Sequence, residues 1–410
     1  MSAASGDLTM RDVAPGEGAL PFGSDATVAV SVKDARALIE TLIRLDGQVR
    51  AILLISYAQP ASVVDALAEE AGASALVTDR ADLNGMPPQA LRAARRSEVE
   101  TRWLMTTSGT TGQPKIVPHT LKSLARTVSH YEGNQQARWG LLYDPTRFAG
   151  MQVVLQAVIG RAALIAPDLD APLAEQVATL HQAGCSHLSA TPTLWRRLLM
   201  VPQLKSLPLK QITLGGEIVD QQILDALRAA FPDTRITHIY ASTEAGVGFS
   251  VNDGKAGFPV SYFDRLPGGT KMENKDNTLH FHLADGQSVN SGDRVKIEGE
   301  RAYFLGRDNG MINVGGVKIY PEGVERVIMD VPGVALARIY AKSSPITGAL
   351  VAVDVMPDGE VDKAALKKAI QTHCKAHLER EAVPAIIRIV PDLEVSAAGK
   401  IIRKTEGGAA

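Results

Sequence analysis

A loop rich in hydroxyl groups and glycine is the segment of this chain whose residue types are best suited to chemistry. The nine residues Thr107–Lys115, TSGTTGQPK, contain four hydroxyl side chains, two glycines and a terminal lysine. Glycine lets backbone N–H groups turn toward an anion, hydroxyls add donors, and lysine adds a mobile positive charge, so the loop is predicted to bind phosphate. It lacks the G-x-x-x-x-G-K-[ST] pattern of a Walker A loop, and no G-x-G-x-x-G follows a strand, which disfavours a dinucleotide fold.

The segments that must position this loop alternate, up to about residue 250, between short β-branched runs and amphipathic stretches. Examples are Ala51–Ser56 and Lys210–Gly216, each followed by a stretch with helical spacing. Such alternation is typical of a parallel sheet with crossover helices. From about residue 256 to 305, short alternating runs punctuated by Gly, Asp and Asn predict an antiparallel β element.

A third pattern begins after Gly306, where strand-like runs accompany helical stretches at Pro321–Asp330 and Asp362–Arg380. This indicates a compact α+β domain of ordinary size. The predicted fold class is therefore α/β, with a large N-terminal α/β domain that has parallel sheets and a small β element, followed by a small α+β C-terminal domain. We place the large domain at residues 1–308 and the small one at residues 309–410.

Composition and charge exclude several classes of protein. Lys and Arg number 43 and Asp and Glu number 45, so the formal charge of -2 gives no electrostatic argument for nucleic-acid or membrane-surface binding. Cys185 and Cys374 lie far apart without metal-ligand spacing, which argues against a disulfide framework or a zinc site. No signal peptide and no apolar run long enough to span a membrane is visible. We expect a cytoplasmic protein.

Four later blocks accompany the phosphate-loop sequence: YASTE (Tyr240–Glu244), SGD (Ser291–Asp293), GRDNGMINVGGVKIYPEGVE (Gly306–Glu325) and VSAAGKIIR (Val395–Arg403). Together the five blocks resemble the adenylate-forming superfamily of acyl-CoA synthetases, adenylation domains of nonribosomal peptide synthetases and firefly luciferase. The resemblance runs from Leu104 to the C-terminus, about three quarters of the chain. It implies that ATP and a carboxylate form an acyl-adenylate and pyrophosphate, after which a thiol usually captures the acyl group.

The resemblance also implies roles for single residues in nucleotide binding. Thr243 is expected to touch the α-phosphate and Glu244 to hold the magnesium ion, because a hard cation that bridges phosphates suits a carboxylate ligand. The β- and γ-phosphates are expected on Thr107, Ser108, Gly109, Thr110, Thr111, Gly112 and Lys115. The adenine is expected between Gly215, Gly216 and Glu217 on one side and Tyr240 and Ala241 on the other, and the ribose hydroxyls on Asp293 and Arg307.

The first reaction step brings a carboxylate anion against a polyanion. Two unit charges 4 Å apart repel by roughly 4 kcal/mol at an effective dielectric of 20, so the protein must supply positive charge and positioning. By resemblance Lys400 reaches from the small domain to neutralise this charge and is the foremost catalytic residue. Asn309 corresponds to the hinge about which the small domain is expected to rotate between an adenylating and a thioester-forming pose.

The segment that faces the acid, YDPTRFAGM (Tyr143–Met151), leaves two alignments open. In one, Asp144 pairs with an ammonium group of the substrate. In the other, Arg147 or Phe148 faces the substrate, and an arginine there favours an additional anionic group. In a third, purely structural interpretation, Asp144 lies in a turn and Arg147 on the surface.

The sequence predicts an AMP-forming acid–thiol ligase that uses ATP, Mg²⁺ and, as the acceptor, coenzyme A. The first alternative is an enzyme that loads an acyl or amino acid onto carrier-protein phosphopantetheine, and the second is a degenerate nucleotide-binding protein without catalysis. Only 103 residues precede Leu104, fewer than the family usually carries, so we expect a pared-down N-terminal subdomain and a more open pocket or a covering partner. A homo-oligomer is compatible with this interpretation.

Overall fold

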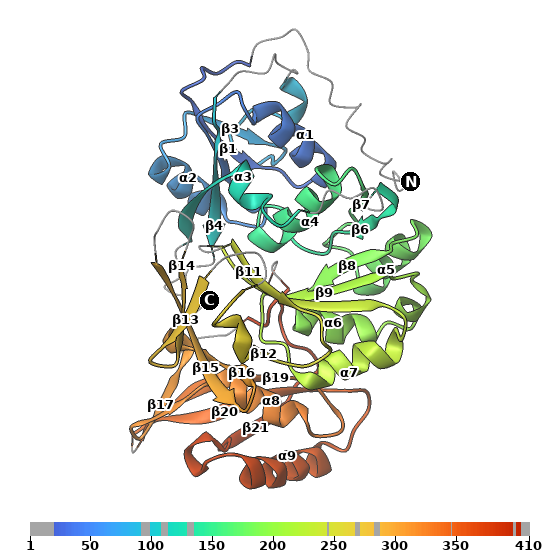
Figure 1. Cartoon of the computed structure of the whole chain (residues 1–410), viewed down its shortest axis with the longest axis vertical. Helices are drawn as coiled ribbons and strands as arrows, with labels where there is room; N and C mark the ends of the chain where they lie inside the picture. The colour runs from blue at the N-terminus through green and yellow to red at the C-terminus, as the bar shows by residue number, and fades with distance from the viewer. Residues whose placement is uncertain are drawn as a thin grey trace. The chain divides into compact units, whose positions relative to one another are not determined.

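The computed structural model describes residues 20–91, 99–107, 114–128, 135–243, 246–266, 271–282, 288–345, 347–396 and 399–402 (Figure 1). Within these residues the chain forms two compact units, and each is described by itself. Unit 1 comprises the described residues of Met1–Ser189, Val201–Thr213 and Ser242–Val247. Unit 2 comprises those of Ala190–Met200, Leu214–Ala241 and Gly248–Ala410. The division of the chain into domains at residue 308 stays a prediction.

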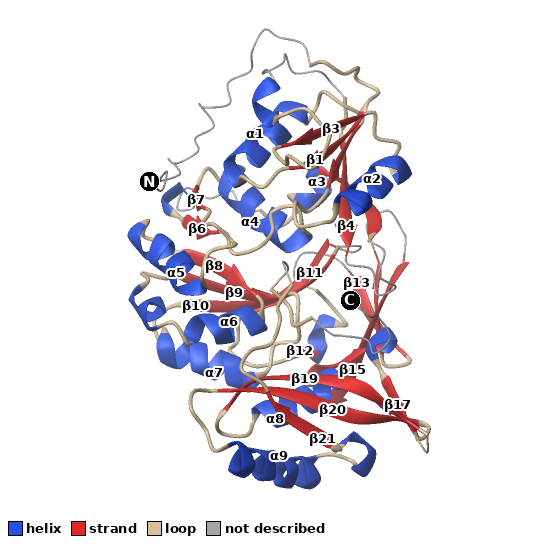
Figure 2. Ribbon diagram, turned by 180° about the vertical axis from the view of Figure 1, so that it is seen from behind, coloured by secondary structure: helices blue, strands red, loops and turns tan. Residues whose placement is uncertain are grey.

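The first sheet of unit 1 has the strand order β3-β1-β2-β4-β5, in which β5 alone runs antiparallel to its neighbour. Apolar residues of β1 and β2 are buried on both faces, as in a parallel sheet covered by helices. Helices α1 and α2 lie on opposite faces of this sheet (Figures 1 and 2). The strands are β1 (Thr27–Ser31), β2 (Ala51–Leu54), β3 (Ala75–Thr78), β4 (Arg102–Thr107) and β5 (Lys115–Thr120), and the helices are α1 (Ala35–Leu45), α2 (Ala61–Glu70) and α3 (Leu121–Leu124).

A second sheet has the order β11-β10-β9-β8-β6-β7, and β6 pairs in parallel with both β7 and β8. The parallel α/β arrangement predicted for the N-terminal region is therefore confirmed. The strands are β6 (Arg138–Gly140), β7 (Ala163–Ile165), β8 (His187–Ala190), β9 (Gln211–Gly215), β10 (Arg235–Ser242) and β11 (Gly246–Val251). The helices that alternate with them are α4 (Phe148–Val158), α5 (Leu173–Gln182), α6 (Pro192–Leu199) and α7 (Gln221–Ala230).

The antiparallel element predicted after residue 256 is a five-stranded sheet of order β12-β16-β15-β14-β13. Its buried face contributes Phe258 and Phe281 to an aromatic cluster that Phe249 of β11 also joins. Alternating side chains of the strands supply this face, as the sequence pattern predicts. The strands are β12 (Phe258–Pro259), β13 (Lys271–Lys275), β14 (Thr278–His282), β15 (Ser288–Glu298) and β16 (Arg301–Arg307).

The C-terminal part of unit 2 is the predicted α+β arrangement. A three-stranded sheet of order β19-β20-β21 shares one apolar core with α8 and α9 (Figure 2). The elements are β17 (Ile312–Val314), β18 (Val317–Ile319), α8 (Pro321–Met329), β19 (Val334–Ser344), β20 (Gly348–Pro357), α9 (Lys363–His377) and β21 (Ile386–Ile389). Short 3-10 helices occur at Pro88–Ala90, Pro202–Ser206, Val260–Tyr262, Asp308–Gly310 and Arg380–Ala382.

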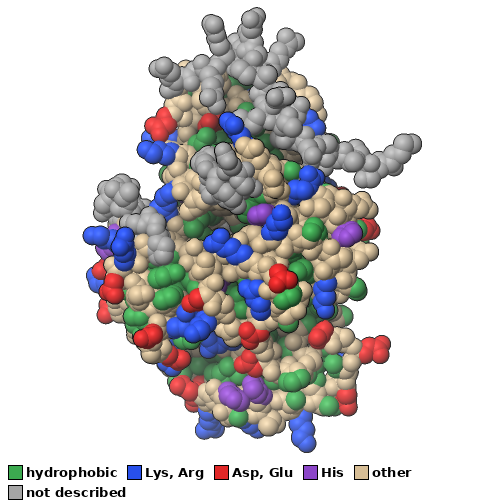
Figure 3. Space-filling model, turned by 45° about the vertical axis from the view of Figure 1, so that its right-hand side comes forward, with side chains coloured by type: hydrophobic (Ala, Val, Ile, Leu, Met, Phe, Trp, Pro, Cys, Tyr) green, Lys and Arg blue, Asp and Glu red, His purple; other side chains and the backbone are tan. Residues whose placement is uncertain are grey.

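The surface of the described residues shows no strong segregation of charge on the face drawn in Figure 3, where Lys and Arg side chains are interspersed with Asp and Glu. None of the helices in the described ranges combines the length and the apolar character that crossing a membrane requires.

A buried carboxylate ties the three C-terminal strands together. Asp354 on the central strand β20 stands in register with Arg338 on β19 and Arg388 on β21. Its oxygens accept hydrogen bonds from Arg338 Nη2 at 2.6 Å and Arg388 Nε at 2.8 Å. Burial alone would raise the pKa of Asp354, but the bonds from Arg388 and Arg338 outweigh burial and lower it.

We expect Asp354→Asn to destabilise the fold by about 3 kcal/mol, because it leaves two guanidinium groups facing a neutral amide. The pKa of Asp354 is lower in the folded protein than in the unfolded chain, where it is about 3.9. The ionised carboxylate therefore stabilises the fold fully above the unfolded-state pKa, and this stability is lost as the pH falls through the folded-state pKa. The difference in unfolding free energy between the two proteins should therefore be constant above about pH 5 and shrink below about pH 4. Urea unfolding at several pH values measures it, and a difference that does not change with pH would contradict the ion-pair assignment.

Candidate active site

The structure gathers the predicted site residues into two groups, one in each unit. In unit 1, Thr107 ends β4 and Lys115 begins β5, and the two residues stand directly opposite each other in the antiparallel register. Both ends of the predicted phosphate loop are thus fixed by the sheet, and the Lys115 side chain is exposed. Ser108, Gly109, Thr110, Thr111, Gly112 and Glu244 lie outside the described residues.

His119 links the phosphate-loop strand to the predicted α-phosphate residue. Its Nε2 lies 2.8 Å from the backbone oxygen of Thr243, an acceptor, so Nε2 carries the proton and donates. The His119 ring is tilted against the ring of Phe148, with centroids 5.9 Å apart. Sequence analysis did not select His119, although it lies in the strand KIVPHT directly after the loop. Thr243 and Phe148, two of the predicted site residues, are therefore both in contact with a residue that was missed.

Asp144 and Arg147 have different surroundings at the start of α4. Asp144 Oδ1 accepts hydrogen bonds from the backbone nitrogen of Thr146 at 2.8 Å and from its hydroxyl at 2.6 Å, and Asp144 is only 2% exposed. This is the geometry of a turn that the Asp side chain stabilises. Arg147 is half-buried rather than on the surface, and its Nη1 donates to the backbone oxygen of Thr106 at 2.9 Å.

In unit 2, Lys400 lies beside the glycine segment predicted to border the adenine. Gly216 has a φ of +81°, and a Cβ built on it would lie 3.4 Å from Lys400 Cε and 3.8 Å from Nζ. Glycine adopts this backbone conformation without strain, and because it has no Cβ it leaves space for the Lys400 side chain. The structure therefore brings together Lys400 and Gly216, which are far apart in sequence.

The N-terminus of α6 holds both of these segments. Thr191 is the N-cap residue, and its hydroxyl accepts from the backbone nitrogen of Leu194 at 3.1 Å and donates to the backbone oxygen of Gly399. Glu217 Oε2 accepts from the backbone nitrogen of Thr193 at 3.0 Å. Carboxylates are stabilised at helix N-termini. Thr191 was missed by sequence analysis, although Thr followed by Pro is a typical start of a helix.

Thr191 is therefore expected to position Lys400 for the adenylation step. We expect Thr191→Val to lower the rate of adenylate formation about tenfold, which corresponds to one hydrogen bond of about 1–1.5 kcal/mol. Thr191→Ser, which keeps the hydroxyl, should restore most of the rate. Single-turnover measurement of both half-reactions tests this. A similar loss in Thr191→Ser, or in thioester formation from supplied acyl-adenylate, would contradict a positioning role.

Tyr240, Asp293 and Arg307 form one hydrogen-bonded group. Asp293 and Arg307 are cross-strand partners on β15 and β16, and Arg307 Nε donates to Asp293 Oδ1 at 2.9 Å. Tyr240 donates its hydroxyl proton to Asp293 Oδ2 at 2.5 Å. Burial, reinforced by the negative charge of Asp293, raises the pKa of Tyr240, so the phenol remains a donor. The Tyr240 ring stacks against Phe249, Phe281 and Phe304, with centroids 5.1–5.4 Å apart.

The remaining predicted residues lie in strands or directly after one. Ala241 follows Tyr240 on β10, and Gly215 ends β9. The backbone of Asn309 lies in a short 3-10 helix directly after β16. Its neighbour Asp308 accepts a hydrogen bond from Arg294 Nε at 2.6 Å, so the predicted hinge begins at an ion pair.

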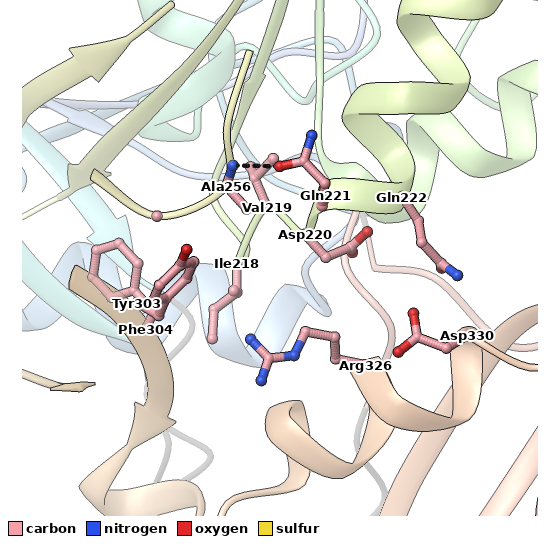
Figure 4. Close-up of a pocket in the computed structure, with 11 residues that line it drawn as sticks. Ile218, Val219, Asp220, Gln221, Gln222, Ala256, Tyr303, Phe304, Arg326 and Asp330 are labelled. Atoms are coloured by element: carbon pink, nitrogen blue, oxygen red, sulfur yellow. Dashed lines mark hydrogen bonds between the residues drawn. The ribbon is translucent and has the colours of Figure 1, made fainter. Parts of the chain in front are cut away.

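A cavity of about 200 Å³ adjoins the Tyr240 stack in unit 2 (Figure 4). Ile218, which follows Glu217, lines it together with Phe304, and Figure 4 shows Arg326 and Asp330 on one helix with Asp220 across the cavity. Burial raises the pKa of Asp330. The cavity is smaller than the roughly 300–1,000 Å³ usual for ligand pockets.

Comparison with known proteins identifies two matching family models. The AMP-binding enzyme model matches residues 23–274, and the AMP-binding enzyme C-terminal domain model matches residues 323–400.

Curated relatives share parts of this chain. Surfactin synthase subunit 1 of Bacillus subtilis is 23% identical over 93% of the chain and 12% of its own length. The fatty acid–[acyl-carrier-protein] ligase MmaC of Mycobacterium marinum is 35% identical over 31% of the chain and 25% of its own length. The mitochondrial acyl-coenzyme A synthetase ACSM1 of Homo sapiens is 28% identical over 45% of the chain and 30% of its own length. The chain thus spans less than a third of the length of these relatives.

Solved structures have the same fold. The anthranilate CoA ligase AuaEII in complex with anthranoyl-AMP gives a TM-score of 0.76 at 15% identity, covering 93% of this chain and 86% of the other. ATP-bound MatB from Rhodopseudomonas palustris gives 0.74 at 18% identity, covering 93% and 88%. The expected fold class, a parallel-sheet α/β region with a smaller C-terminal part, is confirmed.

Proposed function

Because the chain belongs to the family of AMP-binding enzymes, the adenylate-forming superfamily, we propose that it is an ATP-dependent ligase that joins a carboxylic acid to a thiol. In the first step a carboxylate oxygen attacks the α-phosphorus of ATP, and the bond to the β-phosphate oxygen breaks to release pyrophosphate. In the second, the thiol sulfur attacks the acyl carbon and AMP leaves. Coenzyme A is the proposed thiol.

The observation that carries this proposal is the placement of Lys400. Its ammonium group lies beside Gly216, in the segment whose Glu217 is fixed on the N-terminus of α6. A cation held there supplies the positive charge that the approach of carboxylate and phosphate requires. Asp293, fixed by Tyr240 and Arg307, offers a charged acceptor for ribose hydroxyls.

Magnesium is implied by the family, and its proposed ligand Glu244 lies outside the described residues. When bound, the ion would neutralise phosphate charge and orient the leaving pyrophosphate. The steps assigned to Lys400, Thr243 and Asp293 do not depend on its geometry.

A carrier-protein thiol is the second candidate acceptor. It is favoured by the 35% identity to MmaC, which is named as an acyl-carrier-protein ligase. Supplying either coenzyme A or a phosphopantetheinylated carrier protein to the enzyme with a preformed acyl-adenylate separates the two candidates. Thioester formed only on the carrier protein would overturn the proposal of coenzyme A.

We also propose a cytoplasmic enzyme. Both cysteines are buried and free, and burial raises the pKa of Cys185 to about 12 and that of Cys374 to about 11, so they stay as protonated thiols. Two unpaired thiols fit a reducing compartment.

Carboxylate-dependent exchange of labelled pyrophosphate into ATP tests the function. The panel contains aryl, short, medium and long acyl, dicarboxylic and amino acids, with Lys400→Ala as the control. Exchange that requires one class of acid and disappears in the control supports adenylation. ATP binding without exchange across the panel would favour the degenerate nucleotide-binding protein.

A further inference from the structure

We propose that the acid activated by this enzyme carries a second anionic group and that Arg147 binds it. The inference rests on the proposed adenylating function and names its substrate class, an acid with a second carboxylate. Four observations support it. The backbone at Arg147 is held by hydrogen bonds, two nitrogens of its guanidinium group donate no hydrogen bond within the described residues, Asp144 is buried, and aromatic side chains lie in the same part of unit 1.

The backbone at Arg147 is held on both sides. Its nitrogen donates to the backbone oxygen of Asp144 at 3.1 Å, and its oxygen accepts from the nitrogen of Met151 at 2.8 Å as the first bond of α4. A Cβ at Gly150 would lie 2.1 Å from the Asp144 oxygen, so the first turn of α4 packs directly on the Asp144 turn. A side chain that leaves such a rigid point is pre-organised for a ligand.

The guanidinium group of Arg147 is half-buried, and only one of its nitrogens is used. Nη1 donates to the oxygen and the hydroxyl of Thr106 at 2.9 and 3.3 Å, whereas Nε and Nη2 donate no hydrogen bond within the described residues. No carboxylate of the described residues lies within 4.0 Å of the Arg147 guanidinium. Burial lowers the pKa of Arg147, and the more distant charge of Asp144 only partly opposes this. A desolvated cation is costly unless an anion pairs with it, and the Nε–Nη2 edge matches a carboxylate.

Asp144 does not pair with the Arg147 guanidinium, and it is poorly placed to bind an ammonium group of a ligand. One oxygen is used by Thr146, and the other has no hydrogen-bond partner among the described residues, but the residue is only 2% exposed. A ligand could reach Asp144 only if the turn opened. Arg147 is accessible without such a movement, so the structure favours an anionic over a cationic substituent.

The surroundings of Arg147 favour an acid over the phosphates of ATP. Phe148 follows Arg147 at the start of α4, and its ring lies against that of His119, so this part of unit 1 offers aromatic surface for a carbon skeleton. The phosphate loop has its own cation in Lys115, which pairs with Thr107 across the two strands that hold the loop.

The test measures binding by calorimetry without ATP, together with pyrophosphate exchange. Matched probes are valerate and glutarate, benzoate and the three benzenedicarboxylates, and 4-aminomethylbenzoate for the ammonium alternative. Variants are Arg147→Met, Arg147→Lys, and Arg102→Gln as a control, because Arg102 is exposed at the other end of β4 and its loss changes the net charge equally. Circular dichroism verifies that each variant is folded, and Arg147→Lys keeps the test valid if Arg147→Met does not fold.

For at least one pair we expect the diacid to bind the unmodified protein 10- to 100-fold more tightly than its monoacid, the range for a charge-assisted bidentate contact. The preference should fall below about threefold in Arg147→Met, be partly retained in Arg147→Lys and be unchanged in Arg102→Gln. The proposal is overturned if the unmodified protein shows no diacid preference, or if the preference survives in Arg147→Met. It is also overturned if the aminomethyl acid binds more tightly, or if the Arg147 variants raise the KM for ATP without altering acid selectivity. Exchange with monoacids alone refutes this inference while the ligase function stands; diacid binding without any exchange refutes the ligase function while the anion site stands.

Discussion

Lys400→Ala is expected to slow acyl-adenylate formation by about 100- to 1,000-fold, the usual loss when one preorganised electrostatic group is removed from a transition state. In the structure the Lys400 amine lies beside Gly216, and its loop is bonded to Thr191 through Gly399. We therefore expect the charge to lie where carboxylate and phosphate approach each other. Thioester formation from supplied acyl-adenylate should be nearly unaffected, because that step involves no such approach of anions.

Separate assays of the two half-reactions measure this effect. Lys368→Ala, which removes an exposed lysine of α9 in the same unit, is the control for net charge and should match the unmodified enzyme in both. Lys400→Arg should recover part of the adenylation rate, since it keeps the charge but not the geometry. Equal losses in both half-reactions of Lys400→Ala would refute the assignment.

The arrangement of secondary structure could be predicted because it depends on local patterns. The buried run Ala51–Leu54 and the helix Lys363–His377 follow directly from period and composition. The antiparallel sheet after residue 256 is equally visible in its alternating residues. These signals lie within a few residues of the element they specify.

The contacts that complete the site could not be predicted in the same way. Thr191 and Gly399 are 208 positions apart, and His119 and Thr243 are 124 apart, so no local pattern connects them. The motifs supplied Lys400 and Thr243, whereas the residues that hold them are visible only when the chain is folded.

The choice between Asp144 and Arg147 illustrates the same limit at short range. They are three positions apart, and sequence alone allows either to face the acid. The fold distinguishes them because α4 begins at Phe148 with Arg147 as its N-cap, while Asp144 stabilises the preceding turn. The decision depends on where the helix starts, and helix boundaries are the least certain part of any sequence interpretation.

Asp293→Ala is expected to lower kcat/KM for ATP by about 10- to 150-fold and to destabilise the protein by about 2 kcal/mol. The ribose hydroxyls would lose a charged acceptor worth about 1.5–3 kcal/mol, and the buried Tyr240 hydroxyl would lose its acceptor. The Arg307 side chain is 51% exposed and that of Asp293 12%, so water compensates much of the lost ion pair, and its contribution to stability is small.

The nucleotide itself separates the two effects. If Asp293 binds ribose hydroxyls, 2′-deoxy-ATP or 3′-deoxy-ATP should be a poor substrate for the unmodified enzyme, and that penalty should almost vanish in Asp293→Ala. Tyr240→Phe, which removes only the hydroxyl that donates to Asp293, should lower stability while the deoxynucleotide penalty persists. A penalty that is the same in Asp293→Ala and in the unmodified enzyme would mean that Asp293 only supports Tyr240 and Arg307, and the ribose would then have to be bound by other residues.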